Sequence, residues 1–384
     1  KSLIRDFLNN VNNYKFILES RNVVIKNRGS IMFNNMKQAY NISTELLHIL
    51  NNYNNGDDDL YHVVVQKGNV GSRYLYALQL LNEGNNIYVF RGDKSYRSNF
   101  DKNSPVLRLI RKEKNDSTYY TAGGHTQTWE YAYANKNEWF VGTKPNDLNP
   151  SAAKWTKQIA RVTIPQNKKI KSNTELPRLS NLNYAGSSYG IGYSGNKMFR
   201  VEAAVSLDHN YFMVITGDNA NNAYFSIYSL SAINNALDSN GTSPVDIRNY
   251  ASDCKDAFKI SNLSGSNGLI GSLQGFDFSY DEVTNQGYIY ISSQYSPNDG
   301  DGGESRKIVK IPWRSTDPSE WEEVDLRTNP GTLDEDAGSY RTELEGIQLI
   351  DNNDVYLTVA YHDPSQGNLT VMNRIYRVTW SSSI

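Results

Sequence analysis

Four segments of the chain repeat one pattern of polar and apolar positions. Each opens with Gln or Glu at the start of a short strand, continues with a strand rich in aromatic residues, and ends with a strand in which apolar and charged residues alternate. The four copies begin at Gln127, Glu202, Gln274 and Glu345, so successive copies start 75, 72 and 71 residues apart. A weaker fifth copy opens near His62. The pattern predicts a β-repeat of about seventy residues.

A repeat of three or four antiparallel strands cannot bury its apolar face alone, so several copies must pack side by side. Radial packing produces a β-propeller, which leaves only short edges. Residues 288–291 are apolar on both faces of their strand, as expected between blades, whereas residues 307–311 alternate, as expected nearer the rim. The regular spacing favours an all-β, five-bladed β-propeller over a two-sheet sandwich or tandem β domains. We predict that this domain covers residues 41–384.

The first forty residues do not follow the repeat. Residues 2–12 and 36–50 place apolar positions at mixed helical and strand spacing. We expect residues 1–40 to form a helical or irregular N-terminal extension. Residues 44–50 have a second interpretation, because they also fit a strand that closes the ring beside the last blade.

Composition excludes several functions. The 384 residues carry a net charge of −2, so nothing indicates a nucleic-acid partner or a cationic amphipathic helix that lies on membranes. No run of eighteen apolar residues is present, which excludes a transmembrane helix. The single cysteine, Cys254, excludes an intrachain disulfide framework. Tyr, with 27 copies, and abundant Asn are typical of many short strands joined by turns.

The residues that open the repeats form the strongest candidate site. If they are equivalent, their side chains meet around the propeller axis as a polar ring of His62, Gln127, Glu202, Gln274 and Glu345. Buried polar groups must find partners, so one interpretation is a structural network that ties the blades together. The other is a ligand site at the mouth of the axis. Further candidates for ligand contact are His125, two residues before Gln127, and the aromatic residues Trp129, Trp139 and Trp155.

The sequence offers weak grounds for catalysis. Residues 186–190 match G-x-S-x-G, but they lie in a loop rich in Gly, Ser and Tyr and not between a strand and a helix. The five histidines lack metal-ligand spacing, and the loop with Asp299 and Asp301 lacks the terminal Glu of a calcium site, so a solvated hairpin loop is the better interpretation. Glu202 and Glu345 are the only obvious pair of carboxylates. We therefore expect no catalytic residue, metal or cofactor.

Nine segments between about residue 60 and residue 380 carry a resemblance to a known family. They are VVVQKGNVGSRYLYALQL (63–80), AGGHTQTWEYA (122–132), WFVGTKP (139–145), KWTKQIARV (154–162), PRLSNLNYAGS (177–187), GNKMFRVEAAVS (195–206), IYISSQ (289–294), IVKIPW (308–313) and YLTVAYH (356–362). Together they resemble the helveticin J family, large heat-labile bacteriocins of lactobacilli. Residues 1–40 extend beyond the family pattern.

The resemblance implies a secreted antibacterial protein that inhibits or kills related bacteria. It supplies no set of catalytic residues. We expect the partner to be a glycan, wall polymer or receptor on the surface of the target cell, bound without catalysis. Two alternatives stay open from the sequence, namely a glycoside hydrolase that acts on the cell wall and a non-toxic, lectin-like adhesin of the envelope.

Overall fold

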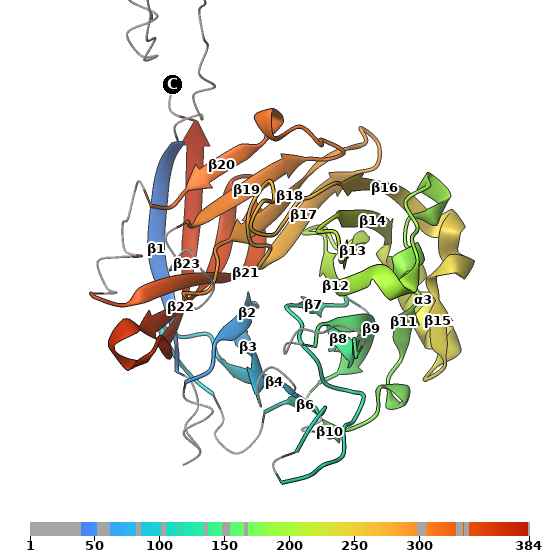
Figure 1. The fold of residues 1–384 in the computed structure, drawn as a ribbon, viewed down its shortest axis with the longest axis horizontal. Coiled ribbons are helices and arrows are strands. Elements are labelled where there is room, and N and C mark those ends of the chain that lie inside the picture. The colour runs from blue at the N-terminus through green and yellow to red at the C-terminus, as the bar shows by residue number, and fades with distance from the viewer. Residues whose placement is uncertain are drawn as a thin grey trace, which may run out of the picture. The chain divides into compact units, whose positions relative to one another are not determined.

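Five antiparallel sheets follow one another around a common centre (Figure 1). The structure is a computed structural model that describes residues 40–51, 62–81, 86–100, 105–113, 115–133, 137–147, 154–164, 168–297, 305–327, 333 and 338–382. The predicted five-bladed β-propeller is confirmed. Residues 1–39, which the sequence assigns to an N-terminal extension, lie outside the described residues, and so does the loop with Asp299 and Asp301.

Each blade begins with the strand nearest the axis, and the blades are numbered in chain order. Blade 1 contains β2 (Val65–Val70), β3 (Tyr74–Leu81), β4 (Asn86–Asp93), β6 (Leu107–Leu109) and β10 (Lys168–Ile170). Blade 2 contains β7 (Trp129–Tyr131), β8 (Glu138–Pro145), β9 (Thr156–Thr163), β11 (Arg178–Ser180) and β15 (Pro244–Asp246). Blade 3 contains β12 (Met198–Val205), β13 (Tyr211–Asp218), β14 (Ala223–Ser229) and β16 (Cys254–Ile260).

The last two blades complete the ring. Blade 4 contains β17 (Phe276–Asp281), β18 (Gln286–Ser293), β19 (Lys307–Pro312) and β20 (Glu322–Asp325). Blade 5 contains β21 (Arg341–Asp351), β22 (Asp354–Asp363), β23 (Leu369–Ser382), β1 (Tyr40–Asn51) and β5 (Arg97–Asn99). The blades therefore combine strands that are consecutive in sequence with strands that come from elsewhere in the chain.

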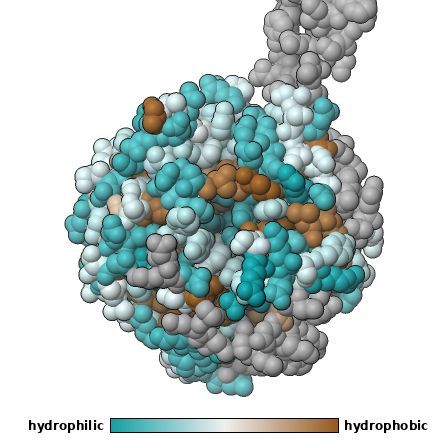
Figure 2. All heavy atoms as spheres, turned by 180° about the vertical axis from the view of Figure 1, so that it is seen from behind, coloured by the Kyte–Doolittle hydropathy of each residue, from teal (hydrophilic) through white to brown (hydrophobic). Residues whose placement is uncertain are grey.

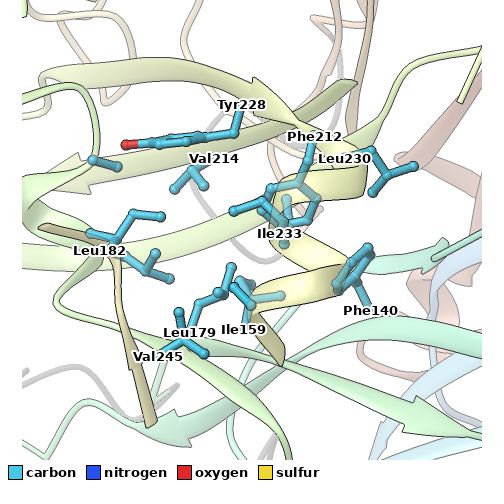
Figure 3. Packing of buried hydrophobic residues seen from close by; sticks show 14 of the residues in the cluster. Phe140, Ile159, Leu179, Leu182, Phe212, Val214, Tyr228, Leu230, Ile233 and Val245 are labelled. Atoms are coloured by element: carbon cyan, nitrogen blue, oxygen red, sulfur yellow. The ribbon is translucent and has the colours of Figure 1, made fainter. Parts of the chain in front are cut away.

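Apolar side chains fill the spaces between neighbouring blades. Between blades 2 and 3 the rings of Phe140 and Phe212 lie 4.7 Å apart, and both side chains are fully buried (Figure 3). The helix α3 (Leu230–Asn240) adds Ile233 and Leu237 to the same cluster. Burying a side chain of this size contributes about 1.5–3 kcal/mol. Apolar residues on both faces of a strand therefore serve to join each blade to its two neighbours.

Short 3₁₀ turns occupy many of the connections. In chain order they are η1 (Asn173–Glu175), η2 (Leu182–Tyr184), η3 (Ser187–Tyr189), η4 (Gly195–Lys197), η5 (Ile247–Asp253), η6 (Pro318–Glu320) and η7 (Pro364–Gln366). An Asp side chain caps the first turn of three of them, with Asp246, Asp317 and Asp363 each accepting a backbone N–H two residues ahead.

The ring is closed by a strand from the beginning of the chain. Strand β1 lies beside β23 in blade 5, so the interpretation of residues 44–50 as a closing strand is confirmed. Leu50 is buried in a cluster with Val65 and Ile375, and partly buried Ile42 and Leu46 pack against the core of blade 5. Strand β1 therefore joins blade 5, the last in the chain, to the start of blade 1.

Three short strands also pass from one blade to the blade before it. Strands β5, β10 and β15 lie in the chain segments of blades 1, 2 and 3, but they pair in parallel with β1 of blade 5, β6 of blade 1 and β11 of blade 2. Each covers an outer edge that would otherwise expose unpaired backbone groups. These strands link neighbouring blades by backbone hydrogen bonds in addition to side-chain packing.

The closing strand predicts the result of two deletions. Removal of residues 1–51 takes away β1 and exposes β23, and we expect the free energy of unfolding to fall by at least about 3 kcal/mol because several apolar side chains lose their burial. Removal of residues 1–39 takes away no described strand, and it should leave stability within about 0.5 kcal/mol. Urea denaturation of both variants measures this. Equal stability of the two variants would contradict the assignment of β1 as the closing strand.

Candidate functional site

The inner strands of the five blades begin at one end of the propeller axis, which we call the axial mouth. There Gln127 of blade 2 lies at the centre of a side-chain network. Its Nε2 is 3.2 Å from Gln66 Oε1, 2.9 Å from Gln274 Oε1 and 2.8 Å from Glu345 Oε2. An amide nitrogen has two hydrogens, so it donates to two of these three acceptors at a time. One side chain thus connects blade 2 to blades 1, 4 and 5.

Both carboxylate oxygens of Glu202 accept hydrogen bonds. Its carboxylate accepts hydrogen bonds from the hydroxyls of Thr126 (3.0 Å) and Thr128 (2.6 Å) and from the backbone N–H of Gln127 (3.1 Å). The side chain has no exposed surface. Burial raises its pKa, and the nearby Arg200 acts in the opposite direction. Glu202 therefore fixes the start of β7 in blade 2 against blade 3.

Arg200 provides the positive charge of the network. Its guanidinium donates to Gln127 Oε1 (2.6 Å) and to the backbone oxygen of Leu273 (2.6 Å), and its Nε is 3.3 Å from Glu202. Arg200 is two residues before Glu202 on β12, so both side chains lie on the same face of that strand. The sequence analysis did not single out Arg200, although this spacing indicates it.

Glu345 completes the network from blade 5. Its two oxygens accept from Gln127 Nε2 (2.8 Å) and Gln66 Nε2 (3.2 Å), and its side chain is 1% exposed. Burial and the neighbouring carboxylate of Glu343 raise its pKa well above the ordinary value of 4.5. The network of Gln66, Gln127, Arg200, Glu202, Gln274 and Glu345 is called the axial network below.

The structure differs from the prediction for blade 1, where Gln66 and not His62 joins the axial network. His62 lies at the mouth with its Nδ1 2.8 Å from the backbone oxygen of Thr370. Strand β2 begins only at Val65, and its register with β3 shifts between Val65 and Lys67, so Gln66 is turned toward the axis at a β-bulge. The sequence pattern does not reveal this bulge, which explains the error of four residues.

A second layer of polar side chains follows the axial network, farther from the mouth along the inner segments of the blades. Lys67 Nζ of blade 1 is 2.8 Å from Glu130 Oε1 of blade 2 and donates to the backbone oxygen of Ile347 (2.6 Å). Asp277 of blade 4 accepts the backbone N–H of Leu349 at 2.7 Å. Burial and the charge of Glu130 raise the pKa of Asp277 from 3.8 to about 7. Glu130 and Asp277 each follow the Gln that opens their repeat by three residues, so the repeat pattern could have predicted that these two carboxylates lie in one layer.

A cluster of aromatic side chains lies beside the axial network at the mouth. The ring of His125 is 3.9 Å from the ring of Trp155, and the guanidinium of Arg200 lies 3.8 Å from the centroid of the same indole. His125, Trp155 and Phe199 are all partly exposed. We call these three residues the mouth cluster. It combines aromatic surface with the polar groups of the axial network.

His125 is uncharged in this environment. Its Nδ1 atom is buried and accepts no hydrogen bond from the described residues. Burial of the ring and the charge of Arg200 lower its pKa to about 3. The imidazole is therefore neutral at ordinary pH and contributes an uncharged ring to the mouth cluster.

The expectation that Trp129 and Trp139 contact a ligand needs correction. Their rings stack on each other at 4.9 Å and 8°, and the side chains are 0% and 5% exposed. Both pack against Tyr76 of blade 1, since the first and second strands of blade 2 present apolar side chains to the second strand of blade 1. Of the three Trp residues considered at the start, Trp155 alone reaches the mouth.

Blade 5 contributes an acid–histidine pair that the sequence analysis missed. Glu343 Oε2 is 2.8 Å from His362 Nε2, and His362 Nδ1 lies 3.1 Å from the backbone oxygen of Asn368. Both side chains are buried. Glu343 is two residues before Glu345, on the same strand. The pair holds the start of β21 against β22, next to the axial network.

Other motifs of the sequence do not lead to a catalytic arrangement. Ser188 lies within the short turn η3 after Gly186 in a left-handed conformation, which is not the strand-to-α-helix turn of a hydrolase nucleophile. Within the described ranges, no group of three His, Cys, Asp or Glu side chains is placed to hold a metal ion. In the same part of the chain, no helix has the length and apolar character needed to cross a membrane.

Comparison with known proteins gives one strong match. A family model described as bacteriocin helveticin-J matches residues 38–381. Bacteriocin helveticin-J of Lactobacillus helveticus is 40% identical over 344 residues, which are 84% of this chain and 95% of the relative.

Solved structures are similar only at the level of a weak fold match. An α-L-arabinofuranosidase from Podospora anserina in complex with cellotriose aligns with a TM-score of 0.46 and 12% identity over 91% of this chain and 99% of its own. A thermostable family-43 glycoside hydrolase aligns with a TM-score of 0.40 and 9% identity over 84% of this chain and 93% of its own. These values are too low to support an argument about function.

The raised pKa of Asp277 predicts how stability depends on pH. Since the folded protein holds a proton that the unfolded chain releases above about pH 4, stability should fall as pH rises from about 4 to 7 and then level off. One pKa unit corresponds to about 1.4 kcal/mol, and we expect a loss of at least about 1 kcal/mol between pH 5 and pH 8. Urea denaturation at several pH values measures the slope. The variant Asp277→Asn should flatten it, and an unchanged slope would exclude Asp277 as the cause.

Proposed function

The chain belongs to the helveticin J family of bacteriocins, and from this we propose that it is a secreted antibacterial protein that binds a glycan or wall polymer of target bacteria at the axial mouth and inhibits them without catalysis. The observation that supports binding there is the mouth cluster of His125, Trp155 and Phe199. Aromatic rings provide flat apolar faces on which a sugar ring packs, and the ring of the neutral His125 lies against the partly exposed Trp155.

The surface supports a polar ligand. On the face shown in Figure 2, apolar residues form small patches between hydrophilic ones. A protein that docks on another protein by a large apolar interface would present a wider continuous patch. A polysaccharide instead needs scattered aromatic rings among hydrogen-bonding groups.

The burial and hydrogen bonding of Glu202 and Glu345 support the proposal that the protein acts without catalysis. A general acid or base must come within about 2.6–3.2 Å of a substrate atom. Glu202 and Glu345 are 0% and 1% exposed, and hydrogen bonds from neighbouring blades occupy their oxygens. Their raised pKa values follow from burial inside the axial network, so these shifts are explained without a catalytic role.

The mouth cluster leads to a binding prediction. Substitution of His125→Ala or Trp155→Ala removes part of the proposed sugar-binding surface, and we expect binding to purified cell walls of a sensitive strain to weaken about tenfold. A pelleting assay measures binding, and thermal unfolding shows whether the variants fold. His62→Ala is the matched control, because His62 lies at the same end but bonds to Thr370. Wild-type binding by both mouth variants would place the ligand elsewhere.

The absence of catalysis has its own test. The double variant Glu202→Gln, Glu345→Gln keeps the size of both side chains and removes their acid–base chemistry. We expect it to retain cell binding and most of its inhibitory activity, provided that thermal unfolding confirms a folded protein. Turbidity of a wall suspension, followed in parallel, reports lysis. Loss of inhibition with folding and binding intact would mean that the chain is a hydrolase.

A further inference from the structure

Two aromatic residues adopt a backbone conformation that elsewhere in this protein is mostly left to Asn. Among the described residues, twelve non-glycine residues have positive φ, and eight of them are Asn. The two aromatic ones are Tyr133, at φ 50°, and His209, at φ 56°. Their rings stack on each other with centroids 4.5 Å apart and planes 7° apart. For a bulky residue such as Tyr this conformation is strained, and strain of this kind concentrates at functional positions.

The pair lies at the end of the axis opposite the mouth. Tyr133 follows β7 in blade 2, and His209 lies in the hairpin between β12 and β13 in blade 3. The hairpins after the inner strands of blades 4 and 5 each contain one left-handed residue, Asn285 or Asn353, directly before the second strand, and blade 2 has Asn137 at that position. Tyr133 is therefore a further left-handed residue in the hairpin of blade 2, beyond the Asn that the other blades also use.

Hydrogen bonds hold the residue that precedes Tyr133 in blade 2. The backbone oxygen of Ala132, just before Tyr133, accepts from the side-chain amide of Asn234 on helix α3 at 2.8 Å. The N–H of Ala132 donates to the backbone oxygen of Glu138 at 2.8 Å. The position of Tyr133 is therefore set before any ligand arrives, which lowers the entropic cost of binding.

The loop of blade 3 is fixed in the same manner. The N–H of His209 donates to the backbone oxygen of Ser206 at 2.8 Å. The carboxylate of Asp208 accepts from the hydroxyl of Ser206 at 2.5 Å and from the side-chain amide of Asn210 at 2.7 Å. The imidazole is thereby held beside Tyr133, with polar groups on either side of it in the chain.

Tyr133 is exposed and His209 partly exposed, and neither belongs to the apolar clusters between the blades. Tyr133 is 56% exposed, and the neighbouring Leu207 is 49% exposed. Tyr131 supports the pair from behind, with its ring at 86° to Tyr133 and at 88° to His209. A preformed aromatic surface that is strained, exposed and backed by a third ring is suited to contact with a ligand.

We propose that Tyr133 and His209 form a second glycan-binding site, here called the aromatic platform, on which a pyranose ring packs its C–H face against Tyr133. A flat ring flanked by Asp208 and Asn210 matches a sugar, which presents an apolar face bordered by hydroxyls. The ligand class rests on the proposed function, whereas the location of the platform rests on its own geometry.

Two sites at opposite ends give the molecule two points of attachment. Gln127 and Tyr133 lie on either side of β7 and are six residues apart, a span on the order of 20 Å if the segment is extended. Simultaneous binding of two segments of wall polymer makes the second contact intramolecular, so weak individual sites combine into firm attachment. One protein molecule then links two polymer segments.

The test replaces both aromatic residues by Asn, the residue that most often adopts the left-handed conformation in the described part of this protein. In the full chain, Tyr133→Asn with His209→Asn removes both rings and relieves the backbone strain. We expect an unchanged or higher midpoint of thermal unfolding together with binding to purified Lactobacillus helveticus cell walls that is about tenfold weaker. Tyr133→Phe keeps the ring and should bind within twofold of the original protein. Tyr96→Asn is the matched control, since Tyr96 is 55% exposed without being part of the platform.

Further measurements separate the possible outcomes. Unchanged wall binding by the double variant overturns the platform, and so does a lower unfolding midpoint with normal binding, which means that the rings only stabilise the loops. Walls oxidised with periodate should lose the difference between the original protein and the double variant. If the difference instead disappears on protease-treated walls, the platform binds a protein and the glycan proposal is wrong. Normal binding by His125→Ala beside weak binding by the double variant refutes the mouth site but supports the platform.

Discussion

The propeller depends on pairing every polar group that the inner strands bring to its axis. A buried amide or carboxylate without a partner costs about 1–3 kcal/mol, and five blades bring several such groups to one place. The amide of Gln127 meets this requirement by lying within reach of acceptors from three other blades. Arg200 balances the two carboxylates and bonds to blades 2 and 4. The blades thus hold their positions around the axis through one shared network, and apolar packing between them adds the larger part of the buried area.

The repeat period was sufficient to predict both the architecture and four members of this network. Gln127, Glu202, Gln274 and Glu345 recur at nearly equal spacing, and equal spacing in a closed ring places equivalent residues together. Blade 1 departs from the rule because a β-bulge at Gln66 shifts its register. Arg200 occurs once and not as a repeat, so periodicity cannot find it. The burial of Trp129 and Trp139 depends on how adjacent sheets face each other, which a pattern along one strand does not specify.

The second constraint is that the ring of blades must close. The chain meets it with strands that pair in a different blade from the one formed by their neighbours in sequence. Strand β1 completes blade 5 although it precedes blade 1 in the sequence, and β5, β10 and β15 each extend the preceding blade. These pairings connect residues far apart along the chain, which makes the ring slow to assemble but resistant to the opening of a single blade. Local sequence could indicate β1, whose apolar positions alternate. It could not indicate a three-residue strand such as β10, whose partner is decided by the position of the neighbouring blade.

The hydrogen bonds that fill the axis also explain why both proposed binding sites lie at its ends. A group whose hydrogen-bonding capacity is filled by other blades gains nothing from a ligand unless it first gives up those bonds. Glu202 and Glu345 are in this position, and so their chemistry serves the scaffold. Trp155, whose side chain is partly exposed at the mouth, and Tyr133, held in a strained conformation with more than half of its surface exposed, are in the opposite position. In both cases the fold maintains a feature that its own stability does not require. A rigid ring is well suited to the proposed arrangement, because it would keep the two proposed binding surfaces at a fixed separation and spend no binding energy on ordering them.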